Sequence, residues 1–195
     1  MAIRKVARLG HPVLRKTGRD LSVDEIRSPE TRRLIQDLVE TMAEYGGIGI
    51  AAPQVHESLQ LAILGFDDQN VRYPQLGSQP LTVVINPKIT VLDQTPQAFW
   101  EGCLSVPGLR GLVERPRKIK VEYLDHEACP REIIAEGFLA TVFQHELDHL
   151  NGVLFIDRVK TEPGKSPIAF IEEYEKYLIP ESATGSNPSA EGLLD

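Results

Sequence analysis

The segment His145-Glu146-Leu147-Asp148-His149 constrains this chain more than any other part of its 195 residues. It is an HExxH pattern, in which two histidines four residues apart project from one face of a helix and can share a metal ion. The glutamate beside the first histidine then reaches a water molecule held by that metal. Chance produces this pattern in roughly one chain in a hundred of such a composition. The motif therefore predicts a metal site on a helix.

The residues around the motif, from about Gly137 to Leu150, are expected to form a buried helix that ends at Asn151-Gly152. A helix that is apolar on nearly every side is typical of the centre of a domain. The apolar residues of this segment are Phe138, Leu139, Val142, Phe143, Leu147 and Leu150. The predicted metal site is therefore expected in the interior of the protein.

Two further helices are predicted before this segment, and short strands lie between them and it. Ser22 and Glu25 form a capping box for a short helix. Ser28-Pro29 then begins a longer helix, which Gly46-Gly47 ends. Short β-rich runs separated by turns follow, and connections this short favour antiparallel pairing, which gives an α+β class. These runs cover 61–66, 81–86, 88–92, 110–114, 118–124 and 131–135.

The two ends of the chain carry their own signals. A last helix is expected to begin at Ser166-Pro167 and to end at Pro180. Residues 181–195 are rich in Ser, Gly, Pro, Asn and Glu, so we expect one domain over 1–180 followed by a disordered tail. The first 19 residues contain six basic side chains and no acidic one. Because that segment is short and contains a Gly-His-Pro turn, we expect a structured arm rather than a transit peptide.

Composition excludes several functional classes. The net charge of −7 disfavours a non-specific nucleic-acid binder, and no apolar run approaches the roughly 20 residues that span a bilayer. Two cysteines cannot build a disulfide framework, which suits a reducing compartment. We therefore expect a cytoplasmic protein, or in a eukaryote one of an organellar stroma or matrix, with no membrane partner.

A catalytic metal site needs a third protein ligand besides the two histidines, with one position left open. Downstream, the position where one peptidase pattern has a histidine is Phe155, which cannot bind a metal. Glu172 or Glu173 would suit the spacing of another pattern, but both belong to an acidic segment for which exposure is the simpler interpretation. Upstream, Cys103 follows a β-rich run, although most free cysteines, Cys129 included, are small buried hydrophobes. From residues alone the third ligand stays open.

The segment Gly47-Ile48-Gly49-Ile50-Ala51-Ala52-Pro53-Gln54 is a third signal. Two glycines two residues apart predict backbone that a ligand or a neighbouring strand approaches closely. The Lys-Ser/Thr of a phosphate-binding loop is missing. By itself, a tight turn into a strand of small residues explains this segment.

Together the three segments closely resemble the three motifs of the peptide deformylases. GIGIAAPQ at 47–54, EGCLS at 101–105 and QHELDH at 144–149 occur in the family's order and spacing. The resemblance extends to GHPVLR at 10–15 and covers roughly residues 3–160. It implies antiparallel β-sheets wrapped around a central metal-binding HExxH helix, with helices near both termini. It also implies a hydrolase that removes the formyl group from the formyl-methionine of nascent polypeptides and releases formate.

The same resemblance implies the metal ligands. Cys103, His145 and His149 would hold the ion, and a water molecule would take the fourth position. The physiological metal of the family is usually iron(II), with zinc(II), nickel(II) or cobalt(II) able to occupy the site. A thiolate and two neutral imidazoles leave a divalent site with a net charge of about +1, which helps to acidify the water.

Catalytic roles follow from the resemblance for three further residues. The metal-bound water would attack the formyl carbonyl while Glu146 acts as general base, and Glu146 would then pass the proton to the departing amine. The side-chain amide of Gln54 and the backbone N–H of Leu104 would donate hydrogen bonds to the developing oxyanion. The sequence does not decide whether Asp148 supports the metal site or pairs with a nearby base.

Substrate contacts are expected around the same helix. Phe138 and Val142 lie seven and three residues before His145 and so share its helix face. By resemblance, Ile48 completes an apolar slot for the methionine side chain. Backbone near Gly49 would pair with the extended substrate, and Arg110 matches a basic position after the second motif.

The expected partners are formyl-methionyl nascent peptides, with weak ribosome association. In some bacterial deformylases a basic C-terminal helix contacts the ribosome, but residues 172–195 of this chain contain six acidic side chains and one base, Lys176. Ribosomal RNA would repel such a segment, so that docking mode is not expected here.

Two other classes compete with a deformylase. An HExxH endopeptidase would not need Cys103 as a ligand. A non-catalytic metal-binding protein would give no role to Glu146 or Gln54.

Overall fold

The computed structural model describes residues 2–66, 78–160 and 167–174. Its helices are α1 (Val23–Arg27), α2 (Pro29–Glu44), α3 (Phe138–Leu150) and α4 (Ile171–Glu173). Its strands are β1 (Gly49–Ala51), β2 (Leu61–Phe66), β3 (Gln79–Cys103), β4 (Val106–Leu124), β5 (Pro130–Glu136) and β6 (Ile168–Phe170). The tail predicted over 181–195 lies outside the described residues.

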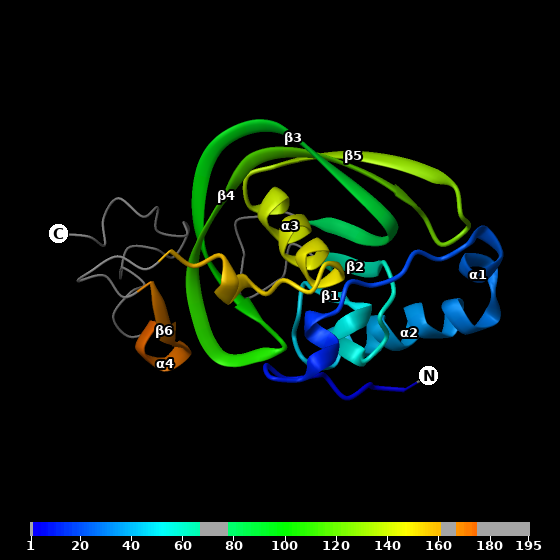
Figure 1. The fold of residues 1–195 in the computed structure, drawn as a ribbon, viewed down its shortest axis with the longest axis horizontal. Coiled ribbons are helices and arrows are strands. Elements are labelled where there is room, and N and C mark those ends of the chain that lie inside the picture. Colours follow the sequence, from blue (N-terminus) through cyan, green and yellow to red (C-terminus); the bar gives the residue numbers. More distant parts are fainter. Residues whose placement is uncertain (1, 67–77, 161–166, 175–195) are drawn as a thin grey trace.

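All described strand pairs are antiparallel. The sheet runs in the order β1-β2-β3-β4-β5, and β6 pairs with β4 beside this path. Figure 1 shows the long strands β3 and β4 curving around α3, while α1 and α2 lie together at the other end of the molecule. The predicted α+β class with antiparallel pairing is confirmed.

The two N-terminal helices begin where the capping signals predict. The Ser22 hydroxyl accepts a hydrogen bond from the backbone N–H of Glu25, whose carboxylate accepts one from the Ser22 N–H in return. Ser28 caps α2 in the same way through the N–H of Thr31. Such caps satisfy helix donors that would otherwise lack partners, which fixes the first residue of each helix. The buried face of α2 packs through Leu34, Leu38 and Met42.

Helix α3 carries the HExxH residues and contacts β1, β2, β3, β4 and β5. Phe143 and Leu150 are fully buried within it. Each such side chain stabilises the fold by about 1.5–3 kcal/mol relative to an exposed one. Because packing on several sides fixes the rotation of α3, the direction in which its polar residues project is fixed as well.

The run predicted at 61–66 coincides with β2, and 131–135 falls within β5, but the other predicted runs belong to two longer strands. The runs 81–86 and 88–92 are both parts of β3, and 110–114 and 118–124 are both parts of β4. Asn86, at the predicted turn, has a φ of 50°, and the register shifts there between Ile85 and Lys88. A bulge of this kind bends a strand without ending it, so the Asn-Pro signal marks a bend rather than a turn.

The helix predicted from Ser166-Pro167 is wrong over its first residues. Ile168–Phe170 form β6, with register pairs Leu109↔Phe170 and Gly111↔Ile168 on β4, and α4 covers only Ile171–Glu173. The spacing of apolar residues along the chain carries no information about backbone hydrogen bonds to β4. These bonds stabilise a strand here, although the spacing favours a helix. The predicted end of this helix lies outside the described residues.

The basic N-terminal segment packs onto the domain. Val6 and Ala7 are buried, and the backbone N–H of Ala7 donates to the carbonyl of Gln54 at 2.7 Å. The N–H of Leu9 donates in the same way to Ser105 at 2.8 Å. The segment therefore ties together two stretches that both reach the cavity described below. No helix within the described residues is long and apolar enough to cross a membrane.

Candidate metal centre and active site

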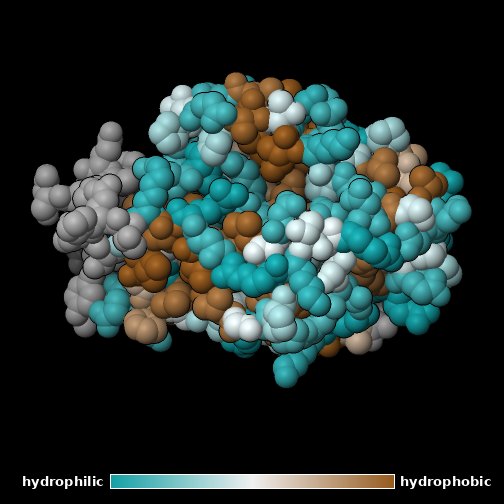
Figure 2. Space-filling view, viewed as in Figure 1, coloured by the Kyte–Doolittle hydropathy of each residue, from teal (hydrophilic) through white to brown (hydrophobic). Residues whose placement is uncertain are grey.

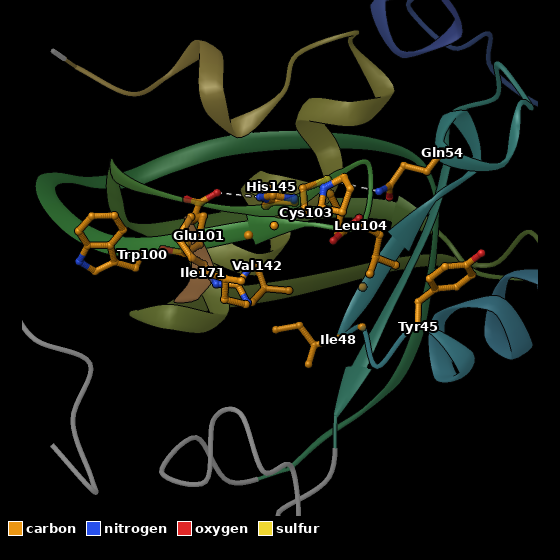
Figure 3. A pocket seen from close by; sticks show the side chains of 18 of the residues that line it. Tyr45, Ile48, Gln54, Trp100, Glu101, Cys103, Leu104, Val142, His145 and Ile171 are labelled. Atoms are coloured by element: carbon orange, nitrogen blue, oxygen red, sulfur yellow. Dashed lines mark hydrogen bonds and ion pairs between the residues drawn. The ribbon is translucent and has the colours of Figure 1, made fainter. Parts of the chain in front are cut away.

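One cavity of about 270 Å³ brings the three sequence motifs together. Its walls come from the start of β1, the end of β3, the beginning of β4 and one face of α3, as Figure 3 shows. Every candidate catalytic and substrate residue of the sequence analysis lines it: Ile48, Gly49, Gln54, Leu104, Arg110, Phe138, Val142 and Glu146. Cys103 and His145 line it too.

Cys103, His145 and His149 form a compact group whose ligand atoms all lie within 4.8 Å of one another. The Cys103 Sγ is 3.2 Å from the His149 Nε2. A tetrahedral ion bound at its usual distances to N and S holds such donors roughly 3.3–3.8 Å apart. The residues present therefore fit a divalent transition metal. Three donors leave a fourth position open, which is the arrangement of catalytic rather than structural sites.

The alternative third ligands lie elsewhere. Glu172 and Glu173 are exposed on α4. Phe155 stacks on the His145 ring at a centroid distance of 6.1 Å. Of the upstream and downstream candidates, the structure brings Cys103 to the two histidines.

Glu101 fixes the orientation of His145. Its Oε2 lies 2.7 Å from the His145 Nδ1, and a carboxylate can only accept, so this Nδ1 carries a proton and Nε2 is left for a metal. Glu101 also accepts two hydrogen bonds from Arg115, at 2.6 and 2.9 Å. Burial raises the pKa of Glu101, but the bonds from Arg115 and His145 outweigh it and hold the pKa below its ordinary value.

The sequence left open whether Asp148 supports the metal site or pairs with a nearby base, and in the structure it pairs with two arginines. It accepts a hydrogen bond from the Arg115 guanidinium at 2.8 Å and also pairs with Arg158. Arg115 is only 2% exposed and therefore bridges Glu101 to Asp148 in the interior. A charge buried this deeply is stable only when paired, so the network holds α3 and the end of β3 in one arrangement.

The surroundings shift the pKa values of the two histidines in opposite directions. Burial lowers the pKa of His149 well below its usual value, and the positive charges of His145 and Arg115 lower it further. A neutral imidazole is the form that binds metals. Burial also lowers the pKa of His145, but Cys103 and Glu101 outweigh it and raise the pKa well above the usual value. A metal at the His145 Nε2 competes with that proton.

Glu146 is buried beside the metal group. Its Oε2 has no hydrogen-bond partner among the described residues. Desolvation is the main cause that raises the pKa of Glu146 to about 7, a value suited to a group that takes and returns a proton near neutral pH. The carboxylate lies directly against Gly49, because a Cβ added there would come within 2.5 Å of its Oε1.

This contact gives a first prediction. Replacing Gly49 by alanine should displace the Glu146 carboxylate and lower the catalytic rate by about a hundredfold, since misplacement by about 1 Å has this effect. The variant should keep its metal, because the three atoms nearest to an added Cβ all belong to Glu146 and none to a metal-binding side chain. Turnover measured beside metal content on the same sample checks both statements. Unchanged turnover in the folded variant would contradict the proposed role of this contact.

Gln54 is held with its amide group toward the site. Its Oε1 accepts from the backbone N–H of Ala51 at 2.8 Å, so its NH₂ must point the other way. That NH₂ lies 3.5 Å from the Cys103 Sγ and 3.2 Å from the Ser105 Oγ. Gln54 itself is 2% exposed. A buried, oriented amide of this kind is a preorganised hydrogen-bond donor.

A family model described as "Polypeptide deformylase" matches residues 3–164, which is most of the chain. A peptide deformylase of Leptospira biflexa is 46% identical over 161 residues, covering 83% of this chain and 90% of its own length. The chain belongs to the polypeptide deformylase family. Members of this family are metal-dependent hydrolases.

Solved deformylase structures share the fold. A class I type b peptide deformylase from Acinetobacter baumannii, with Met-Ala-Ser bound, superposes with a TM-score of 0.77 at 38% identity. The match covers 81% of this chain and 99% of that one. A deformylase from Synechococcus elongatus in complex with actinonin gives 0.71 at 38% identity, covering 83% and 85%. The deformylase fold therefore extends over most of the chain.

Sequence reasoning missed two residues of the network around the metal group, Glu101 and Arg115. A signal for Glu101 exists, because residues two apart on a strand share a face, and Glu101 lies two residues before Cys103. Arg115 carries no comparable signal. It reaches Glu101 only through the pairing of β3 with β4, where the register shifts before the final pair Cys103↔Val106.

Proposed function

We propose that this chain removes the N-terminal formyl group from the formyl-methionine of nascent polypeptides and releases formate. Membership of the deformylase family supports this reaction. The observation that carries it is the group of Cys103, His145 and His149, whose ligand atoms lie within 4.8 Å of one another. This group lies beside the buried carboxylate of Glu146 in a cavity, which suits hydrolysis of a small amide.

The metal would be held by the Cys103 Sγ and the Nε2 atoms of His145 and His149. We propose iron(II) as the physiological ion, with zinc(II), nickel(II) or cobalt(II) able to occupy the same donors. When bound, the ion supplies Lewis acidity, which polarises the formyl carbonyl and makes a nearby water more acidic. In this proposal α3 is the central metal-binding helix around which the antiparallel strands are wrapped.

Glu146 would move the proton. As the water oxygen bonds to the formyl carbon, the Glu146 Oε2 takes a proton from it. The C–N bond then breaks with its electron pair on nitrogen, and Glu146 delivers the proton to that nitrogen. The products are formic acid and a peptide with a free amino terminus, and the formic acid then gives up its proton to become formate, while the amino group takes up a proton at neutral pH. The absence of a hydrogen-bond partner for Oε2 among the described residues supports this role.

Gln54 and Leu104 would stabilise the negative charge on the formyl oxygen. The Gln54 amide is oriented by its bond from Ala51, and Leu104 lies in the tight connection between β3 and β4, within the cavity lining. One such donor is typically worth about 2.7–4 kcal/mol of the barrier.

The substrate would enter as an extended strand. Ile48, Phe138 and Val142 line the cavity and offer an apolar slot to the methionine side chain. Backbone near Gly49 would pair with the peptide. Arg110 lies over Gly102, where an added Cβ would meet its guanidinium, and would contact the peptide from the opposite wall.

Residues 1–180 would form one catalytic domain and 181–195 a tail without a role in the chemistry. The enzyme would act in the cytoplasm on formyl-methionyl nascent peptides, with weak ribosome association and no specificity for nucleic acid. The acidic composition of 172–195 supports an association that does not use that segment.

Formate release from formyl-Met-Ala-Ser tests the reaction. Protein prepared anaerobically, with one iron per chain measured on the same sample, should release formate and Met-Ala-Ser. Acetyl-Met-Ala-Ser, which the same cavity would bind, serves as the matched control and should react far more slowly. Absence of formate with a full complement of iron would overturn the proposal. Cleavage between Met and Ala would indicate an endopeptidase instead.

A further inference from the structure

The N-terminal segment holds two stretches of the active site by backbone hydrogen bonds. The N–H of Ala7 donates to the carbonyl of Gln54 at 2.7 Å. Two residues later, the N–H of Leu9 donates to the carbonyl of Ser105 at 2.8 Å. Gln54 is one of the two proposed oxyanion donors, and Ser105 directly follows the other, Leu104. Because the two donors come from separate motifs, a third segment that binds beside both can set their separation.

Ser105 links this segment to the metal group and to the Gln54 amide. It is fully buried. Its N–H donates to the Cys103 Sγ at 3.4 Å, and its hydroxyl oxygen accepts from the Gln54 amide at 3.2 Å. Its carbonyl accepts from Leu9, so all three of its polar groups have partners. A shift of Ser105 would therefore move the neighbouring Leu104 N–H and disturb the Gln54 amide together.

Leu9 lies in a tight turn. The N–H of His11 donates to the carbonyl of Arg8 at 2.9 Å. Gly10 has a φ of 99°, whereas the φ of Leu9 is negative. A positive φ at the third position alone is typical of a type II turn. The Leu9 side chain is 46% exposed, so the contact of this residue with Ser105 depends on its backbone N–H rather than on its side chain.

The turn is anchored on both sides. Buried apolar residues before and after it pack in one core cluster with Cys103: Ala7, Val13 and Leu14. The His11 ring lies edge-on to the His56 ring at a centroid distance of 4.6 Å, and His56 ends the 3₁₀ helix η2 (Ala52–Val55), which carries Gln54. Figure 1 shows the segment in dark blue at the lower edge of the molecule, where the surface in Figure 2 is mostly hydrophilic. Contacts on its inner side therefore fix the turn against the site.

We propose that Leu9 is a positioning residue of the active site, whose N–H holds Ser105 and thereby fixes the Leu104 N–H relative to the Gln54 amide. The inference rests on the proposed function. Donors stabilise a developing oxyanion only from hydrogen-bond distance, and misplacement by about 1 Å costs about a hundredfold in rate. Leu9 itself lies outside the cavity lining described above. Its effect belongs to turnover rather than to substrate binding, because the donors act on charge that develops during the reaction.

The test replaces Leu9 by proline in the iron-loaded full chain. Proline has no N–H but suits the second position of a type II turn, so the change removes the bond to Ser105 and keeps the turn. The kcat for formate release from formyl-Met-Ala-Ser should fall about tenfold, because the donor beside Ser105 is still present but is held less firmly. KM and iron content should stay within about twofold of those of the unaltered chain.

Leu9→Ala is the matched control, because it removes the same side chain and keeps the N–H. It should retain the normal kcat. If Leu9→Ala lowers kcat as much as Leu9→Pro, or if neither does, the positioning role is refuted while the reaction stands. Proline also restricts the residue before it, and Arg8 lines the cavity, so a rise in KM without a fall in kcat would assign the effect to Arg8 and overturn the proposal. If the unaltered chain releases no formate, the proposed function itself fails.

Binding of the product provides a readout that a general change of the cavity would alter. Met-Ala-Ser has no formyl oxygen, so the two donors have nothing to stabilise in its complex. Its inhibition constant should therefore be the same for Leu9→Pro and for the unaltered chain. Weaker inhibition of the variant would show that the whole cavity has changed, and would overturn the proposal.

Gly10→Ala tests the same turn if Leu9→Pro does not fold. An added Cβ at Gly10 meets no atom within 4 Å, but a φ of 99° is unfavourable for alanine. The turn should shift while every N–H remains, and kcat should fall about threefold with a normal KM. An unchanged kcat in this variant would refute the positioning role.

Discussion

Replacing Glu146 by glutamine is expected to lower kcat for formate release by about a thousandfold, while the metal stays bound. A positioned general base contributes about 10²–10⁴ to a rate, and in the proposed mechanism Glu146 moves the proton in both halves of the reaction. Glutamine keeps the shape of the buried side chain and the packing against Gly49 but cannot accept the proton. The loss should therefore appear in kcat rather than in metal content.

The measurement needs a comparison that separates chemistry from folding. Glu44→Gln makes the same change at an exposed position on α2 and should leave turnover unchanged. Metal analysis and a thermal melt on each variant show that the site and the fold persist. Formate release by Glu146→Gln at close to the normal rate would refute the proton-transfer role and would leave the metal proposal intact.

The features that sequence analysis predicts best are those set by neighbours along the chain. Ser22 and Ser28 begin their helices where predicted because a cap needs only a side chain and the next turn of backbone. The spacing of His145 and His149 is likewise a local property of one helix. These signals place the residues on their elements before any packing is known.

The features that the sequence could not predict depend on pairing between strands that are far apart along the chain. Ile168 and Ile171 fit a helical stripe, yet the first lies in β6, because the edge of β4 offers backbone hydrogen bonds that no local pattern reveals. Arg115 joins Glu101 to Asp148 only once β3 and β4 are in register. Glu101 is an intermediate case. It lies two residues before Cys103, so assigning both to one strand would have predicted that their side chains share a face.

Replacing Cys103 by serine is the second change with a large expected effect. A serine hydroxyl is a far weaker metal ligand than a thiolate, and two imidazoles alone do not complete a catalytic site. The metal content of the purified variant is expected to fall from about one per chain to a small fraction, and kcat/KM to fall by about a hundredfold or more. Metal analysis and formate release on the same sample measure both.

Cys129→Ser is the matched control, since Cys129 is the other cysteine of the chain, half-buried and outside the described metal group. It should retain both metal and activity. The comparison also discriminates between enzyme classes that share the HExxH helix. An endopeptidase with a downstream carboxylate ligand would keep its metal when Cys103 is changed, whereas the deformylase proposal requires that the thiolate be a ligand. If Cys103→Ser kept all of its metal, Cys103 would not be a ligand and the proposed set of three ligands would be refuted. The main structural support for a deformylase over an endopeptidase would then be lost.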